Sequence, residues 1–356
     1  MSPTQAPAFT AWLDEFLAEY YRHRPVNATF IGEHEHDHRL PDFSENGAGD
    51  CLAGMTSLLH RLDSLPPEPL TVAETIDRTL AAGYLRTQIW EFTSEHFHRG
   101  NPSFYTGEAV FSIIGLFLTD YAPFAERVSA AVDRLHAIPA FLQQAKANVR
   151  RAPVAWTERA IRECDGALAL LGPQGLDLLA QERAQAGESF DGATLRAAAE
   201  VAAAAFAEYR AYLSTDLIHR AGDGYACGEE AFDLMMRHGH ILDLSGDQIV
   251  AYAEDALADA VAFLDAHAAD FGAPSSAEAL ANLANLRPTA AIYYAAYRDI
   301  WRECRATAVR YDLVTWPEFP IEYVPRPQWT RAAAPYLYFL FYRAPAAVNR
   351  PPVHHY

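Results

Sequence analysis

Apolar side chains recur along most of this chain at the spacing of one face of an α-helix. The clearest stripe lies near the start, where acidic side chains fall elsewhere and the apolar positions are Phe9, Trp12, Leu13, Phe16, Leu17, Tyr20 and Tyr21. Similar patterns predict helices at 25–31, in two pieces between 52 and 90 broken at 66–69, and at 101–118, 122–137, 195–214, 245–271 and 289–310. The sequence therefore predicts a mainly α protein, built as an array of helices.

Prolines, glycines and polar caps predict where several of these helices begin and end. Pro25 suits a first helical turn, and Gly32 suits the left-handed position just past a helix end. The polar stretch 33–50 predicts a loop, and Pro139 is expected to start a new helix. Ser245, followed by Gln248, matches the S-x-x-Q capping box and marks a further helix start.

The pattern changes after Pro317, where helical spacing gives way to strand-like segments. Residues 319–324 and 335–343 are expected to form a short β element, and the second segment is apolar on both faces. Such a strand needs a sheet partner and cover on both sides, yet few other strands are predicted. We therefore expect a helical domain over 1–315 and a strand-containing segment over 316–356 that leads into a missing catalytic half. The chain would then be the amino-terminal portion of a larger protein.

Composition narrows the class of protein. Hydrophobic residues make up 51% of the chain and charged residues 21%, which is ordinary for a soluble globular protein. The net charge of −18 disfavours nucleic acid and anionic membranes as partners, because both attract basic surfaces. No apolar run is long enough for a membrane span, no secretory signal pattern is visible, and the cysteines are scattered. These features predict a reduced, cytoplasmic protein.

The segment from His34 to His38 matches H-E-x-x-H, the helical signature of zinc hydrolases. On a helix the two histidines share one face and grip Zn²⁺, while Glu35 polarises a water. Here Gly32 ends the preceding helix, Pro41 blocks a following one, and no apolar stripe accompanies the motif. The context favours a structural loop over catalytic zinc or adventitious metal binding.

A second polar cluster lies near residue 240. His238 and His240, together with Asp243, could act as metal ligands or acid–base groups. Residues of this kind more often cap and bridge helix ends, so the structural interpretation is favoured here too.

The aromatic segment 335–343 is a candidate substrate groove. As a strand it would place Tyr336, Tyr338 and Tyr342 on one face and Arg343 on the other. The hydroxyls could contact a substrate and Arg343 could hold a carboxylate, although packing alone would also explain the aromatic residues. No glycine-rich phosphate loop, nucleophile elbow or specific Cys–His pairing is present.

Residues 16–44 resemble the opening of the bacterial domain-of-unknown-function family 885 (DUF885). That opening has an aromatic helix, then a Pro-x-x-Ala-Thr turn, here Pro25–Thr29, then a Gly-x-His-x-x-Asp-x-x-Leu-Pro-Asp loop, here Gly32–Asp42. Further matches are Asn101-Pro102 and the segments 134–142, 228–237 and 313–317. The resemblance spans essentially the whole chain.

The resemblance implies a helical fold of the thermolysin-like (gluzincin-type) metallopeptidases. The family's His-Glu zinc motif and its later acidic ligand lie beyond the matched region, so no metal ligand or catalytic residue is carried over to this chain. In such folds an edge strand borders the cleft, a position that 335–343 could occupy. The chain would form one wall of a cleft for a peptide or a small amide or ester, and would expose a large apolar patch where the metal-bearing half docks.

Two alternatives stay open from the sequence. The first is a non-catalytic helical binding or scaffold protein with a closed core. The second is a small metalloenzyme that uses His34, Glu35 and His38.

Overall fold

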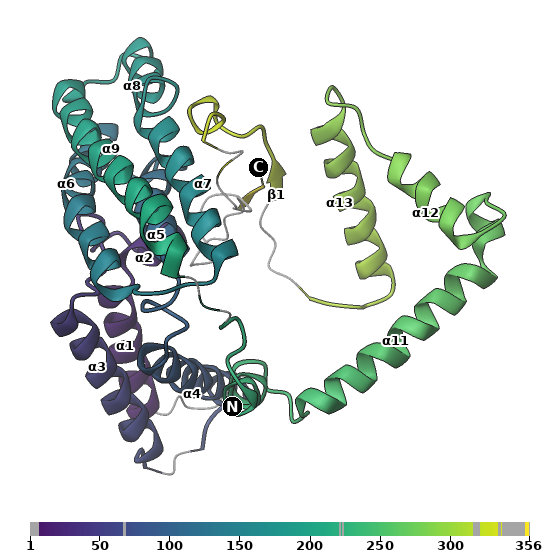
Figure 1. Cartoon of the computed structure of the whole chain (residues 1–356). Coiled ribbons are helices and arrows are strands. Elements are labelled where there is room, and N and C mark those ends of the chain that lie inside the picture. The colour runs from purple at the N-terminus through teal and green to yellow at the C-terminus, as the bar shows by residue number, and fades with distance from the viewer. Residues whose placement is uncertain are drawn as a thin grey trace.

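The structure is a computed structural model that describes residues 7–66, 69–220, 222, 224–315, 321–333, 336 and 353–355. It is mainly helical, as predicted, and the helices between residues 7 and 215 pack into a body (Figure 1). In chain order these are α1 (Pro7–His23), α2 (Pro25–Ile31), α3 (Glu45–Asp63), α4 (Val72–Thr93), α5 (Pro102–Phe117), α6 (Phe124–Asn148), α7 (Val154–Leu171), α8 (Leu176–Gln185) and α9 (Gly192–Thr215). The hydrophobic core lies almost entirely within this body.

The first helices follow the sequence signals closely, with one exception. α2 begins at Pro25, and Gly32 ends it in the left-handed region with φ 98°. α3 begins at Glu45, so the loop predicted for 33–50 is wrong over its last residues. The Ser44 hydroxyl accepts a hydrogen bond from the Gly47 amide at 3.2 Å, and this N-cap starts the helix despite the glycines that follow.

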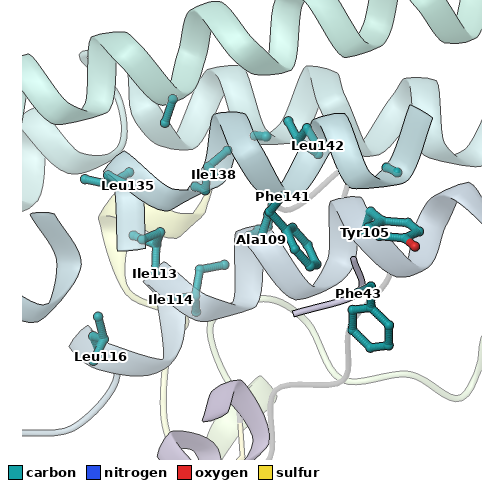
Figure 2. Close-up of a cluster of buried hydrophobic side chains, with 14 of the residues drawn as sticks. Phe43, Tyr105, Ala109, Ile113, Ile114, Leu116, Leu135, Ile138, Phe141 and Leu142 are labelled. Atoms are coloured by element: carbon teal, nitrogen blue, oxygen red, sulfur yellow. The ribbon is translucent and has the colours of Figure 1, made fainter. Parts of the chain in front are cut away.

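α5 and α6 form the centre of the core. Figure 2 shows side chains of both helices interdigitating, among them Ile113 and Ile114 from α5 and Leu135 and Ile138 from α6. The prediction that Pro139 starts a new helix is wrong, because α6 continues through it from Phe124 to Asn148. Proline removes one backbone hydrogen bond, but apolar residues buried on both sides of it hold α6 as one helix.

α7 and α9 pack side by side through small residues. The buried positions of α7 include Ala160, Cys164 and Ala167, and those of α9 include Ala198 and Ala202. The larger stripe predicted on α9 is also buried, namely Phe206, Tyr209 and Leu213. Small side chains let the two helices approach closely. The sequence pattern predicted α9 and did not predict α7.

After α9 the chain passes along α4 before leaving the body. It forms η1 (Leu217–Arg220), α10 (Glu229–Leu234) and a five-residue π-helix, η2 (Met235–Gly239), which packs on α4. A Cβ at Gly83 would lie only 2.0 Å from the carbonyl oxygen of His238. Glycine at this position therefore allows the backbones of α4 and η2 to touch.

The next helices form an arm that stands away from the body (Figure 1). They are α11 (Gly246–Ala266), η3 (Ala268–Phe271), α12 (Ser276–Asn285) and α13 (Tyr293–Arg310). Ser245 and Gln248 form the predicted capping box at the start of α11. No described residue of α11 or α13 is buried, although both helices carry many large apolar side chains. We call residues 241–315 the arm.

The chain then returns to the body through a short segment. β1 (Ile321–Tyr323) pairs in parallel with β2 (Val353–His355), and η4 (Gln328–Thr330) follows β1. Trp329 is buried against Phe117 of α5, with ring centroids 6.3 Å apart. The two three-residue strands are not the strand expected at 335–343, which lies outside the described residues except for Tyr336. The domain boundary expected at residue 315 stays a prediction.

No helix in the described part of the chain combines the length and hydropathy that a bilayer crossing requires.

Candidate functional site

The H-E-x-x-H residues lie in turns that follow α2 and do not form a helix. The His34 ring stacks on Tyr121 with centroids 3.5 Å apart, and its Nδ1 lies 3.0 Å from a carboxylate oxygen of Asp37. His38 points elsewhere, with Nδ1 2.6 Å from Asp133 of α6. Each histidine already has its own acidic partner, so the geometry of a shared zinc site is not formed here.

Asp37 and Arg134 connect this loop to the body. The buried carboxylate of Asp37 accepts hydrogen bonds from the Thr29 hydroxyl at 2.5 Å and from the Tyr121 hydroxyl at 2.5 Å. The buried guanidinium of Arg134 donates to Thr29 at 2.7 Å and to the Ser112 carbonyl at 2.7 Å. It also donates to the carbonyls of Pro25, His36 and Arg39.

The charges in this network are adapted to burial. Burial raises the pKa of Asp37, but hydrogen bonds from His34, Thr29 and Tyr121 outweigh burial and hold the pKa below its ordinary value. Burial lowers the pKa of Arg134 to about 10, so the guanidinium stays charged at neutral pH. The network therefore has the features of a structural anchor for the loop.

The structure does not bring His238, His240 and Asp243 together into one site. His238 lies in η2 on α4, and burial, followed by the charge of Arg86, lowers its pKa. His240 is exposed, and Asp243 lies 3.5 Å from Arg237. Within the described residues, no group of three His, Cys, Asp or Glu side chains is arranged to hold a metal ion. The described residues therefore do not fit a zinc centre.

The predicted substrate residues at 335–343 cannot be placed as a set. Tyr336 lies in a turn, where its amide donates to the Ala333 carbonyl at 3.0 Å, and its side chain is 45% exposed. Tyr338, Tyr342 and Arg343 lie outside the described residues. Their contact with a substrate stays a prediction.

The structure brings together a polar cluster around Arg24 that sequence reasoning missed. Arg24 stands at the start of α2 and donates to the side-chain oxygen of Gln88 on α4, which in turn donates to Glu91. Its guanidinium also lies over the rings of Phe92 and Phe97, 5.5 and 5.1 Å from their centroids. Arg24 thus links α2 to the end of α4 and to the loop that follows it.

Two carboxyl groups flank this arginine with perturbed acidity. Burial raises the pKa of Glu91 on α4 and of Glu108 on α5, and the charge of Arg24 opposes the rise in both. No hydrogen bond to the Glu108 carboxylate is found among the described residues. Half-buried carboxyl groups with raised pKa values are candidates for substrate contact or proton transfer.

A pocket beside the Arg24 cluster is too small for a substrate. Phe16, Tyr20 and Tyr84 help to line it, and the space for centres of water-sized molecules is about 20 Å³. Such a volume holds one or two waters. Burial also raises the pKa of Tyr84 to about 12 and that of Cys51 in the same pocket to about 11, so both groups are neutral at physiological pH.

No spacing rule would have found the Arg24 cluster. Its members come from α2, α4 and α5, and each residue alone has an ordinary sequence context. The only local signal is a charged residue directly before Pro25, where an N-cap would be expected. Arg24 makes no side-chain capping bond there.

Comparison with known proteins identifies the family. The family described as "Bacterial protein of unknown function (DUF885)" matches residues 25–354. The chain belongs to DUF885. No curated protein matches this DUF885 chain.

Two solved structures share the fold of this DUF885 chain. A protein described as a "putative lipoprotein of unknown function" from Shewanella oneidensis superposes with a TM-score of 0.72 at 19% identity, over 98% of this chain and 64% of its own. A protein described as a "putative lipoprotein" from Colwellia psychrerythraea superposes with a TM-score of 0.72 at 12% identity, over 97% of this chain and 66% of its own. The DUF885 chain therefore spans about two thirds of the length of these proteins, and at such identities the likeness shows the fold alone.

Proposed function

We propose that this chain is the helical wall of a zinc-dependent peptidase or related hydrolase. The metal-bearing half would be polypeptide equivalent to the part of the solved relatives that this chain does not match. The observation that carries the proposal is the apolar surface of the arm, which is largely exposed although Tyr297 of α13 lies beside Tyr323 of β1, with ring centroids 5.5 Å apart.

Two helices of the arm carry apolar stripes at helical spacing. On α13 the stripe consists of Tyr293, Tyr297 and Ile300, and on α11 it includes Val250, Leu257 and Val261. All six side chains are exposed. Burying a side chain of this size contributes about 1.5–3 kcal/mol, so covering both stripes would strongly favour association.

The solved relatives support a polypeptide as the cover. Their superposition takes in 98% and 97% of this chain, so the arm is part of the shared fold. About a third of each relative has no match in this chain, which is enough polypeptide for a further domain. We infer that this additional part packs between the arm and the body.

The Arg24 cluster indicates what this wall could contribute to binding. Glu91 and Glu108 both lie near the charge of Arg24, and Glu108 also lies near that of Arg134, while burial raises the pKa of both carboxyls. A peptide amine or an amide N–H would give the Glu108 carboxyl the hydrogen bond that no described residue provides. The chain would thereby orient a peptide or a small amide or ester, while the metal and its water act from the other half.

The apolar surface can be tested on this chain directly. We expect the purified protein to bind an apolar fluorescent dye and to self-associate in analytical ultracentrifugation. The double variant Tyr297→Asp and Ile300→Asp should reduce both signals, whereas Arg298→Asp, at an exposed position of the same helix, should leave both unchanged. A clean monomer that binds no dye would contradict a docking role for the arm.

The hydrolase assignment needs a separate measurement on the natural protein. We would purify the protein from its source cells and identify by mass spectrometry every polypeptide in the purified sample. The same sample would then be assayed for peptide and ester hydrolysis with and without a zinc chelator. Chelator-sensitive hydrolysis, together with polypeptide related to the unmatched third of the relatives, supports the proposal. If the chain self-associates but shows neither chelator-sensitive hydrolysis nor such a polypeptide, the docking surface is supported and the hydrolase assignment is contradicted.

A further inference from the structure

An open groove crosses the body between α3, the loop after α4, and α6. Its volume is about 1020 Å³, which lies at the upper end of the range for small-molecule sites. This α3–α6 groove does not include the arm or the residues of the Arg24 pocket. Its apolar lining consists of Phe43, Ala48, Leu52, Phe92, Ala140 and Ala147.

His98 is an unusual residue in this lining. It is only 2% exposed, and its Nδ1 has no hydrogen-bond partner among the described residues. The ring is held by Phe43, Phe92 and Phe97, with centroid distances of 5.6, 5.2 and 5.8 Å. A buried imidazole nitrogen without a partner is rare in folded proteins, and His98 is also one of the residues that line the groove.

The protonation of His98 follows from its surroundings. Burial lowers its pKa to about 4, with smaller contributions from the charges of Arg99 and Arg24, so the ring is neutral at pH 7. A neutral imidazole has one N–H and one bare nitrogen. Leaving Nδ1 bare costs less than burying an unpaired N–H there, which puts the proton on Nε2. The ring then offers an N–H donor, and no described residue accepts from it.

Two arginines also line the groove. Arg99 follows His98 directly and Arg150 stands just past α6, and both are exposed. Neither forms an ion pair with a described carboxylate. Glu45 and Glu95 also line the groove, so its two arginines are matched in number by two carboxylates.

We propose that the α3–α6 groove binds a small organic anion whose carboxylate or phosphate head meets His98, Arg99 and Arg150 and whose apolar or aromatic body lies on Phe43 and Phe92. The imidazole N–H and the two guanidinium groups are donors suited to an anionic oxygen. The apolar lining provides the surface for the rest of the molecule. This site is independent of the proposed hydrolase.

The test uses titration calorimetry with four probes: inorganic phosphate, acetate, phenyl phosphate and 3-phenylpropanoate. The two probes with an aromatic body should bind measurably tighter than the matching simple ions. Arg99→Gln and Arg150→Gln should each weaken binding about tenfold, the effect of losing one charge-assisted hydrogen bond. Arg162→Gln, an exposed arginine on α7 without an ion pair, is the matched control and should change nothing. Whichever aromatic probe binds tighter identifies the head group as phosphate or carboxylate.

A second variant separates ligand binding from a structural role of His98. His98→Phe keeps a ring in the aromatic cage and removes both nitrogens. We expect an unchanged or higher melting temperature together with at least tenfold weaker probe binding, because a polar atom without a partner is removed. Nitrogen-15 NMR of the wild-type ring should show the Nε2–H form and a shift on addition of probe.

Three results would overturn the proposal. They are the absence of saturable binding by any probe at millimolar concentration, equal binding by the three arginine variants, and a lower melting temperature for His98→Phe with unchanged binding.

Discussion

The body and the arm of this molecule are both helical, yet different forces specify them. In the body, most residues of α5 and almost half of those of α6 are buried, and large side chains such as Tyr209 are fully enclosed. In the arm, no described residue of α11 or α13 is buried. Among the described elements, only α10, α12 and η3 make more than minor contact with α11. The body is stabilised by packing, whereas the arm has little packing of its own.

Local signals explain how the arm is helical in the absence of a core. The capping box at Ser245 satisfies the start of α11, and the Ser275 hydroxyl caps α12 through the Glu278 amide at 3.3 Å. α11 is also rich in alanine, the best helix former. Caps and propensity specify the secondary structure, but they add little tertiary stability. The comparison predicts that equivalent substitutions will have very different costs in the two regions.

The largest expected effect is in the body, at Arg134. Arg134→Met should lower the free energy of unfolding by about 3–5 kcal/mol, because it removes the positive charge 4.0 Å from buried Asp37 and leaves Thr29 and several carbonyls without their donor. Chemical denaturation measures the loss, and hydrogen exchange should show that it falls on the body. Arg162→Met, at an exposed position of α7, is the control and should stay within about 0.5 kcal/mol of wild type. A loss that small for Arg134→Met would mean that the network does not anchor the loop.

The same substitution, leucine to alanine, can be made in the body and in the arm to compare the two regions. Leu142 of α6 is 1% exposed, and Leu257 of α11 is 66% exposed. Leu142→Ala should cost about 3 kcal/mol through lost burial and the cavity left behind, while Leu257→Ala should cost close to nothing. Both values come from the same denaturation experiment. If Leu257→Ala costs as much as Leu142→Ala, then this chain alone already covers the arm, and a docking partner is not needed.

The sequence predicted the elements whose signals are local. The stripe of α1, the proline and glycine that bound α2, and the capping box of α11 were each identified correctly, because each depends on residues close together in sequence. α6 was split wrongly at Pro139, because burial of Leu135 and Phe141 on either side outweighs a local helix-breaking signal. Packing between distant segments decides such cases, and a single sequence does not display it.

The candidate sites were less predictable for the same reason. His34 and His38 formed a visible motif, but tertiary contacts with Asp37, Tyr121 and Asp133 give them separate structural partners. Arg24 and His98 carried no motif, because their surroundings are assembled from several helices and a loop. The residues at 338–343 fall outside the described part of the chain, so their predicted role is untested.

The smallest expected effect is a dependence of body stability on pH through Asp37. The folded-state pKa of this carboxyl is below its ordinary value, because hydrogen bonds from His34, Thr29 and Tyr121 outweigh the opposing effect of burial. A group of this kind contributes stability that is fully present above its unfolded-state pKa of about 4 and is lost as the pH falls through the folded-state value.

Asp37→Asn should cost about 1–2 kcal/mol at pH 7 and should flatten the acid side of the stability curve. Denaturation at a series of pH values measures both effects, with Asp133→Asn, whose carboxylate is half exposed, as the control. Because the arm does not contain this network, hydrogen exchange in α11 and α13 should not change with the variant. A parallel change there would show that the two regions unfold as one unit.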